Sequence, residues 1–279
     1  MRRTIGVIGG DRRQAELARL LAAEGHTVYT YGLEQRSGEP ASGLEQAASS
    51  DVIVLPLPLC KGEGVLNCME DPIPTLQLFR RFRPEQRILA GQIRPQQYGE
   101  AELCGLTLED YFLREEVTVA NAAVTTEAAI QVAMEQLEQT LLGMDCLVLG
   151  FGRIGKLLSL RLSGLGARVT ATARTPEDLA WIRACGWKCL RTEDLDGQLA
   201  PFGVVFNTVP APVLGESLLR QLPRHCLCVD LASRQGIDLA AAERLGLPGI
   251  WARSLPGRLK PKAAAEILRD AIHNILMEG

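Results

Sequence analysis

The chain has 279 residues and a formal net charge of −3, with 47% hydrophobic and 23% charged residues. This length exceeds what one hydrophobic core usually serves, so we expect two domains. The balanced charge gives no electrostatic reason to expect nucleic acid or an anionic membrane as a partner. No signal-peptide pattern begins the sequence, and no apolar run reaches the roughly 18 residues of a membrane span. We therefore expect a cytoplasmic protein without membrane association.

Cysteine and histidine do not form a recognisable metal pattern. The sequence has eight cysteines, and none belongs to a C-x-x-C pair. Several of them lie in apolar runs such as HCLCVDL, where a free cysteine acts as a small hydrophobe. The histidines, His26, His225 and His273, are few and widely spaced. We expect no metal site and no disulfide framework.

The first half of the chain alternates apolar strand patterns with helical patterns. Strands are predicted at residues 4–8 (TIGVI), 27–32, 50–58, 87–93 and 105–111, and a helix at 11–25. Apolar strands that alternate with helices indicate a parallel sheet covered on both faces. Residues 1–124 are thus expected to form a Rossmann-like domain that binds substrate. Its Gly9-Gly10 turn lacks a small third residue, because Gln14 occupies that place, so a nucleotide is not expected there.

A long helical segment separates this domain from a second one. Residues 125–143 contain no proline or internal glycine, begin with Thr125 and Thr126 as candidate caps, and end at Gly143. They predict a connector helix. Residues 144–259 then repeat the strand and helix alternation, and a last helix is predicted at about 262–277. The sequence leaves open whether residues 260–279 complete the first domain.

The second domain opens with a glycine-rich turn, GFGRIG, between an apolar strand and a helix. This order of strand, turn, helix and strand is the one that a dinucleotide-binding unit requires. Gly150 suits the tight turn, Gly152 the approach of a pyrophosphate, and Gly155 the packing of the helix. The free N–H groups of the helix start favour phosphate. The cofactor-binding residues predicted here are Gly150, Phe151, Gly152, Arg153, Ile154 and Gly155.

Arg174 stands where such turns usually place an acidic residue that holds the ribose diol. A guanidinium offers a planar set of donors that matches a phosphate, whereas a carboxylate would repel it. Thr175, followed by Pro176, has the pattern of a helix cap and adds donors. Together Arg174 and Thr175 favour NADP over NAD. The alternative is a surface arginine that stacks on the adenine of either coenzyme.

Two later strands end in polar or turn residues on the side where parallel sheets bind ligands. The segments FNTVP and VDLAS predict that Asn207, Thr208, Val209 and Pro210 flank the ribose and nicotinamide. An ordinary strand-terminal turn is an equally good interpretation of Asn207.

Seven segments, in order along nearly the whole chain, carry a family resemblance. They are VIGGDRRQAELARLL, LPLPLCKGEGVLN, NAAVTTEAAIQVAMEQ, VLGFGRIGKLL, NTVPAPVL, DLASRQG and LPGRLKPKAAAEIL. The combination resembles the dipicolinate synthase A chains of spore-forming bacteria. One segment departs from that pattern, since DLASRQGIDL lacks the Pro-Gly-Gly expected after its arginine.

The alternation of strands and helices in both halves predicts two Rossmann-like doubly wound domains, and the resemblance implies an NADP-dependent oxidation. The reaction would convert a reduced pyridine dicarboxylate to pyridine-2,6-dicarboxylate in the mother cell of a sporulating bacterium. The resemblance also implies a partner, the flavoprotein-like B chain of dipicolinate synthase. A homo-oligomer is left open.

A dicarboxylate substrate requires cationic or N–H-rich groups, and its oxidation requires a hydride acceptor and a base. Candidates from strand-end loops and helix starts are Arg13, Lys61, Thr125, Glu127, Ser233, Arg234 and Lys262. Arg234 is the first choice for a carboxylate clamp. No histidine is well placed for a His–acid pair, and the sequence does not select the base.

Two other classes of function remain open. One is a different two-domain NADP oxidoreductase, of the shikimate or amino-acid dehydrogenase type. The other is a scaffold protein of the complex that binds NADP without catalysing a reaction.

Overall fold

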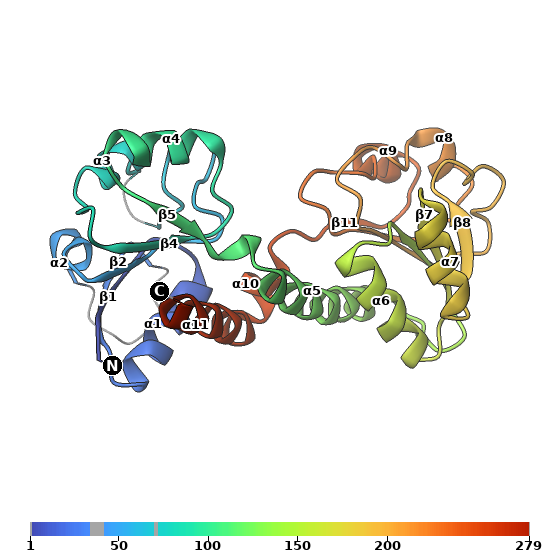
Figure 1. The fold of residues 1–279 in the computed structure, drawn as a ribbon. Coiled ribbons are helices and arrows are strands. Elements are labelled where there is room, and N and C mark those ends of the chain that lie inside the picture. The colour runs from blue at the N-terminus through green and yellow to red at the C-terminus, as the bar shows by residue number, and fades with distance from the viewer. Residues whose placement is uncertain (1, 34–41, 70–71, 279) are drawn as a thin grey trace. The chain divides into compact units, whose positions relative to one another are not determined.

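The computed structural model describes residues 2–33, 42–69 and 72–278. The chain forms two compact units. Unit 1 comprises residues 1–121 and 256–279, and unit 2 comprises residues 122–255. Each unit is a parallel sheet with helices on both faces (Figure 1), so the predicted fold class is confirmed.

The sheet of unit 1 has the order β2-β1-β3-β4-β5. Its strands are β1 (Thr4–Ile8), β2 (Thr27–Tyr31), β3 (Val52–Val54), β4 (Arg87–Ala90) and β5 (Leu108–Asp110). Its helices are α1 (Arg12–Ala23), α2 (Leu44–Ala48), α3 (Thr75–Phe79), α4 (Pro95–Leu103), the 3-10 turn η1 (Tyr111–Leu113) and α11 (Pro261–Glu278). This is a flavodoxin-like strand order, in which the chain changes direction across the sheet between β1 and β3.

Alternation along the strands divides the side chains of unit 1 between two apolar layers. Val52 and Val54 face one layer, which contains α1 and α11, and Ile53 faces the other, which contains α2, α3 and α4. The C-terminal helix α11 lies beside α1 (Figure 1) and contributes buried residues such as Leu268 and Ile272 to the first layer. The end of the chain therefore completes the core of the unit in which the chain begins.

The sheet of unit 2 has the order β11-β10-β9-β6-β7-β8, which is the Rossmann order. Its strands are β6 (Asp145–Leu149), β7 (Arg168–Ala173), β8 (Lys188–Arg191), β9 (Val204–Asn207), β10 (Leu227–Asp230) and β11 (Gly249–Trp251). Its helices are α6 (Arg153–Gly164), α7 (Pro176–Ala184), α8 (Glu216–Leu219) and α9 (Leu239–Arg244), and α10 (Leu255–Leu259) spans the return to unit 1. The change of direction lies between β6 and β9, where ligands of such sheets bind.

The long helix α5 (Glu115–Gln136) differs in its bounds from the predicted connector at 125–143. It begins earlier because Thr126 is accommodated inside the helix, where its hydroxyl donates to the carbonyl of Ala123 at 2.7 Å. It ends earlier, at Gln136, because only Leu137 of the residues from 137 to 140 is partly buried, and the exposed residues Glu138 to Thr140 offer no buried face to support another turn. Thr125 and Thr126 are therefore helix-interior residues and do not cap the helix.

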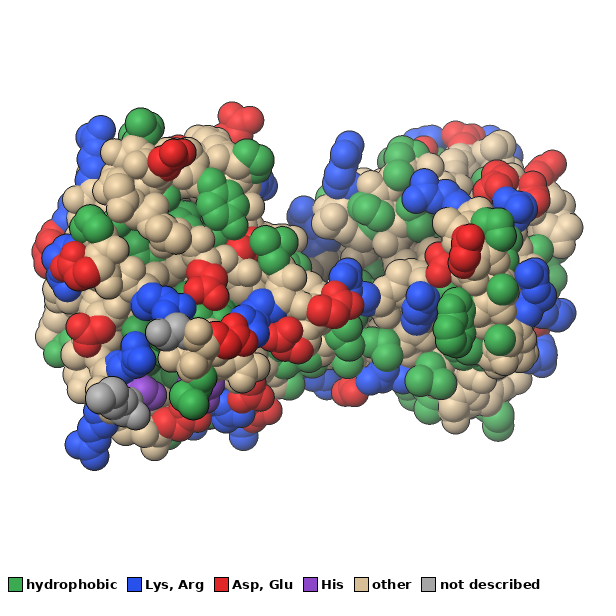
Figure 2. Space-filling model, viewed as in Figure 1, with side chains coloured by type: hydrophobic (Ala, Val, Ile, Leu, Met, Phe, Trp, Pro, Cys, Tyr) green, Lys and Arg blue, Asp and Glu red, His purple; other side chains and the backbone are tan. Residues whose placement is uncertain are grey.

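Among the described residues, none of the helices combines the length and the apolar character needed to cross a bilayer. Basic and acidic side chains are interspersed over the visible surface of each unit (Figure 2). None of the eight cysteines, all of which lie in the described residues, forms a disulfide.

Candidate functional site

The glycine-rich turn connects β6 to α6 at the carboxyl edge of the second sheet. Gly150 adopts φ 93°, and a Cβ there would lie 2.6 Å from Thr208 Oγ1. A Cβ on Gly155 would lie 2.1 Å from the carbonyl oxygen of Gly150. Both positions therefore require glycine for the backbone to fold in this way.

Gly152 has no such structural requirement. A Cβ on Gly152 would meet no atom within 4 Å, and its φ of −76° is open to any residue. Gly152 is also the N-cap of α6 and provides no side-chain hydrogen bond to the helix start. The turn thus leaves space and free N–H donors at a helix N-terminus, which is the arrangement that binds phosphate.

Phe151 and Thr172 hold this turn against the neighbouring strand. The Phe151 ring is buried, packs edge-on against Trp187 with ring centroids 6.2 Å apart, and lies 5.2 Å below Lys156 Nζ. The Thr172 hydroxyl accepts a 3.1 Å hydrogen bond from the N–H of Gly150. The side chain of Phe151 therefore packs within unit 2.

Arg174 directly follows β7 and is exposed, at the same edge of the sheet as the glycine turn. Thr175 caps α7, since its hydroxyl accepts a 3.2 Å hydrogen bond from the N–H of Asp178. The Asp178 carboxylate lies 3.5 Å from Lys156 Nζ, so a cation faces the first turn of α7. Arg174 is thus placed in solvent where it can meet an anion.

Asn207 and Asp230 form a buried network at the ends of β9 and β10. Asn207 Nδ2 donates to Asp230 Oδ1 at 2.9 Å, and both side chains are fully buried. The Asp230 carboxylate also accepts backbone hydrogen bonds from Ala232, Gly236 and Ile237. The Asn207 side chain is therefore hydrogen-bonded within the protein, while Thr208 and Val209 are half-buried and Pro210 is exposed.

Gly236 allows this loop to pass close to Asn207. A Cβ on Gly236 would lie 2.4 Å from Asn207 Nδ2 and 2.7 Å from the carbonyl oxygens of Val209 and Ala211. Ser233 and Arg234, which stand just before it, are exposed at the carboxyl end of β10. The network of Asp230 was not predicted from the sequence, because a single Asp at a strand end does not show which N–H groups surround it.

The remaining substrate candidates lie in different surroundings. In unit 1, the Arg13 guanidinium is buried, pairs with Asp11 at 2.8 Å and donates to the carbonyl of Leu57. Lys61 and Lys262 are exposed, the latter near the start of α11. Arg13 therefore links the turn after β1 to the loop after β3, and its guanidinium is already largely engaged.

In unit 2, both candidates from the expected connector start lie inside α5. Thr125 is buried, and Glu127 lies 3.7 Å from Arg161 with its side chain exposed. Neither residue lies at a helix start, so neither is next to the free N–H groups of a helix N-terminus. Their membership of the site stays a prediction.

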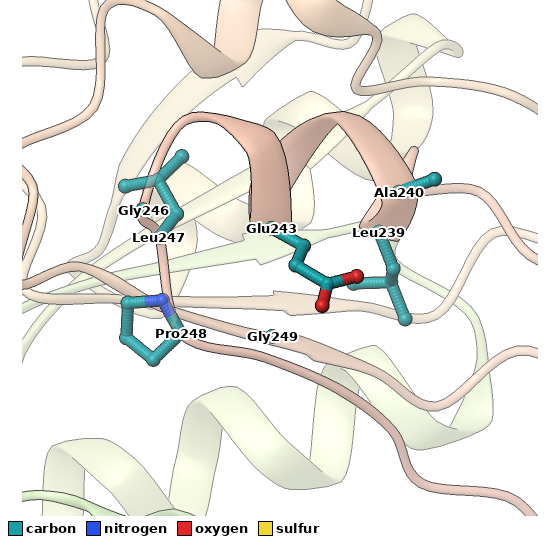
Figure 3. A pocket seen from close by; sticks show the side chains of 7 residues that line it. All are labelled: Leu239, Ala240, Glu243, Gly246, Leu247, Pro248 and Gly249. Carbon is teal, nitrogen blue, oxygen red and sulfur yellow. The ribbon is translucent and has the colours of Figure 1, made fainter.

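Two surface hollows of unit 2 lie away from the glycine turn. One is lined by Leu239, Ala240, Glu243, Gly246, Leu247, Pro248 and Gly249, beside α9 and the first residue of β11 (Figure 3). The other surrounds Met144, Asp145 and Arg168, where β6 and β7 begin. Both lie toward the amino edge of the parallel sheet, whereas ligands of such sheets bind at the carboxyl edge. We therefore place the candidate site at the glycine turn.

Hydrogen bonding and burial shift two pKa values at this amino edge. The Arg168 guanidinium, which hydrogen-bonds the carboxylate of Asp145, lowers the pKa of that group. Burial raises the pKa of the Cys146 thiol to about 12. Neither group faces the glycine turn, so these shifts concern stability.

The structure also brings together two histidines that are far apart in the sequence. The side chains of His26 and His273 gather with that of Glu24, and His273 Nε2 lies 3.0 Å from Glu24 Oε2. The sequence did not indicate this cluster, because His26 and His273 lie near opposite ends of the chain. Arg269 also approaches Glu24 at 3.6 Å, and His26 Nδ1 accepts from the N–H of Arg3 at 3.3 Å. These groups already have protein partners, and we assign no metal to them.

Comparisons with known proteins agree with the resemblance seen in the sequence. Residues 4–112 match the family of the N-terminal domain of the dipicolinate synthase A chain. The dipicolinate synthase A chain of Bacillus subtilis strain 168 is 29% identical over 98% of this chain and 96% of its own length. The resemblance to the dipicolinate synthase A chains is confirmed.

Two solved structures extend the similarity to the fold of both units. The dipicolinate synthase A chain from Bacillus halodurans has a TM-score of 0.86 at 26% identity and covers 99% of this chain and 98% of its own. The dipicolinate synthase A chain from Bacillus subtilis has a TM-score of 0.84 at 29% identity, with 99% and 96% covered. The similarity to these A chains thus includes both the glycine turn and the C-terminal helix.

Proposed function

We propose that this chain is the NADP-dependent dehydrogenase component of a dipicolinate synthase. It would oxidise a reduced pyridine dicarboxylate to pyridine-2,6-dicarboxylate in the mother-cell cytoplasm of a sporulating bacterium, with the flavoprotein-like B chain as its partner. End-to-end similarity to the dipicolinate synthase A chains supports the reaction class. The observation that supports NADP as the coenzyme is Arg174, which is exposed just after β7 at the position where an acidic residue is usual.

The residues of unit 2 fit a phosphorylated dinucleotide. The N–H groups at the start of α6, above Gly152, would hold the pyrophosphate, and Arg174 with Thr175 would hold the 2′-phosphate. Thr208, Val209 and Pro210, at the end of β9, would border the ribose and nicotinamide. When bound, NADP accepts the hydride that leaves the substrate ring.

The substrate would be held by charges that match its two carboxylates. We propose Arg234 as the first carboxylate clamp, because it is exposed on the loop that Asp230 fixes, with Ser233 beside it. Among the other predicted substrate residues, Lys61 and Lys262 are exposed cations of unit 1, whereas the Arg13 guanidinium is held by Asp11 and by the carbonyl of Leu57. The base that takes the ring proton is not assigned.

The reaction itself is the test of this function. Purified chain, NADP and the product of aspartate-semialdehyde–pyruvate condensation are combined with and without the B chain, and pyridine dicarboxylate is followed by its absorbance. Formation of the aromatic product together with reduced NADP is expected. Turnover of shikimate or alanine in its place would identify another dehydrogenase, and NADP binding without any turnover would identify a scaffold protein.

A further inference from the structure

A second arginine lies beside Arg174, brought there by the neighbouring strand. Arg191 is the last residue of β8, and it pairs in register with Ala173, the last residue of β7. Its Nη1 approaches the carbonyl oxygen of Arg174 at 3.5 Å. Because the two strands are parallel, both guanidinium groups belong to the carboxyl edge of the sheet, where the glycine turn lies.

A chain of contacts links the end of β8 to that turn. The hydroxyl of Thr192, which follows Arg191, lies 3.1 Å from the hydroxyl of Thr172, and Thr172 accepts from the N–H of Gly150 at 3.1 Å. The ends of β6, β7 and β8 are thus held together by threonine side chains. The position of Arg191 relative to the turn is therefore determined by the sheet.

The present partner of Arg191 does not prevent it from binding a ligand. Its side chain is 45% exposed and pairs with Glu193 at 3.2 Å, while the Glu193 side chain is 55% exposed. Exposed ion pairs of this kind contribute little free energy, so a phosphate can displace the Glu193 carboxylate or bind the Arg191 guanidinium together with it. Two further acids, Glu177 and Asp178, lie in the first turn of α7, and Asp178 faces Lys156.

We propose that Arg191 is a second ligand of the adenosine 2′-phosphate, together with Arg174, and that it sets the preference for NADP over NAD. This inference rests on the proposed function. A phosphate dianion has three oxygens that accept hydrogen bonds, so two guanidinium groups can bind it at once. The ribose hydroxyls of NAD carry no charge, and they gain far less from a second cation.

The test measures binding of NADP and NAD to the full-length chain by titration calorimetry. Arg191→Gln is expected to weaken NADP binding about tenfold, because a charge-assisted contact is lost, and to leave NAD nearly unchanged. The control is Lys188→Gln, which removes one charge from the opposite end of the same strand β8. This control is expected to bind both coenzymes as the wild type does. Adenosine 2′,5′-bisphosphate serves as a second probe and should show the same loss with Arg191→Gln.

Two further measurements separate a phosphate contact from general electrostatics. Wild-type affinity for NADP should fall more steeply with salt than that of Arg191→Gln, since one fewer contact is screened. Glu193→Gln frees Arg191 from its present partner, so it should bind NADP at least as tightly as the wild type. Weaker binding by Glu193→Gln contradicts the inference.

The outcomes distinguish this inference from the proposed function. If the wild type binds neither coenzyme, the proposed function fails and the inference fails with it. A second outcome is that the wild type prefers NADP, that Arg174→Gln abolishes this preference and that Arg191→Gln retains it. That outcome overturns only the inference. Equal losses in Arg191→Gln and Lys188→Gln would also overturn it. Unfolding of each variant, followed by tryptophan fluorescence, verifies that the fold is intact.

Discussion

The amide of Asn207 donates a 2.9 Å hydrogen bond to the Asp230 carboxylate and thereby joins the carboxyl ends of β9 and β10. Both side chains are fully buried. The carboxylate accepts further hydrogen bonds from the backbone of the loop that follows β10. One buried acid therefore fixes two loops, and these loops carry Thr208 and Arg234.

Asp230→Ala is expected to lower the free energy of unfolding of unit 2 by about 3–5 kcal/mol. The substitution leaves one N–H of the Asn207 amide and several backbone N–H groups buried without an acceptor. Urea denaturation followed by tryptophan fluorescence measures this, since all three tryptophans, Trp181, Trp187 and Trp251, belong to unit 2.

The control for this prediction is Asp238→Ala. Asp238 is exposed and caps α9 through one hydrogen bond to the N–H of Ala241, so its loss should cost only about 0.5–2 kcal/mol. Similar losses for both variants would mean that the carboxylate of Asp230 does not hold the two loops.

Gly152→Ala distinguishes an effect on stability from an effect on coenzyme binding. A methyl group at Gly152 would meet no protein atom within 4 Å, so the free energy of unfolding should fall by no more than about 1 kcal/mol, the cost of alanine at an N-cap. The same methyl group would occupy the space that we assign to the pyrophosphate. Calorimetry should therefore show weaker binding of NADP and NAD alike, and unchanged affinities would remove the pyrophosphate from this turn.

Gly257→Ala is expected to destabilise unit 1 by about 1–3 kcal/mol. Its Cβ would lie 2.4 Å from Asp11 Oδ2 and 2.8 Å from Arg13 Nε, in a pair that is largely buried and leaves little room to move. Circular dichroism in urea measures the loss. The tryptophan fluorescence transition should not move, because every tryptophan lies in unit 2.

Gly99→Ala is the matched control in the same unit. Gly99 lies inside α4, and a Cβ there would meet nothing within 4 Å. Replacing a helix-interior glycine with alanine should therefore stabilise the unit by about 0.5–1 kcal/mol. A loss of stability in this control would invalidate the comparison.

The sequence predicted both sheets, because apolar strands alternate regularly with helices and each glycine turn follows a strand. The sequence did not predict the bounds of α5. The hydroxyl of Thr126 donates to a carbonyl of the preceding turn, so threonine is as suitable inside this helix as at its cap. Nor did the sequence predict β8, a short strand of exposed and half-buried residues with no continuous apolar run. Arg191 was missed for the same reason.

The coenzyme turn was predictable because its glycines have fixed spacing, and this spacing reflects local backbone geometry. The substrate candidates were less well predicted, because their surroundings depend on contacts between distant segments. Arg13 is an example: its partner carbonyl, Leu57, is on another loop, and no feature of the sequence indicated that this guanidinium is buried.

Arg174→Asp is expected to weaken NADP binding by about tenfold to a hundredfold, because a phosphate contact is lost and a repulsive charge is added. NAD binding should change far less, since its ribose hydroxyls can donate to a carboxylate. Titration calorimetry with both coenzymes measures the ratio. Equal losses for NADP and NAD would show that Arg174 does not contact the 2′-phosphate.

Burial of Cys146 predicts how the stability of unit 2 depends on alkaline pH. Its pKa is raised from 9.0 to about 12, mainly by burial in the apolar interior. A raised pKa means that the folded state favours the neutral thiol. This contribution is complete below pH 9 and is lost as the pH rises from 9 toward 12.

Cys146→Ala tests this dependence directly. At about pH 7.5 the variant should be about 1–2 kcal/mol less stable than the wild type, because a buried side chain is shortened. Between about pH 9 and 10.5 the wild type should lose up to about 1.4 kcal/mol per pH unit from this group, so the difference between the two proteins should shrink. Tryptophan fluorescence in urea measures both proteins, and a difference that stays constant over this range would show that the thiol ionises as readily in the folded state as in the unfolded chain.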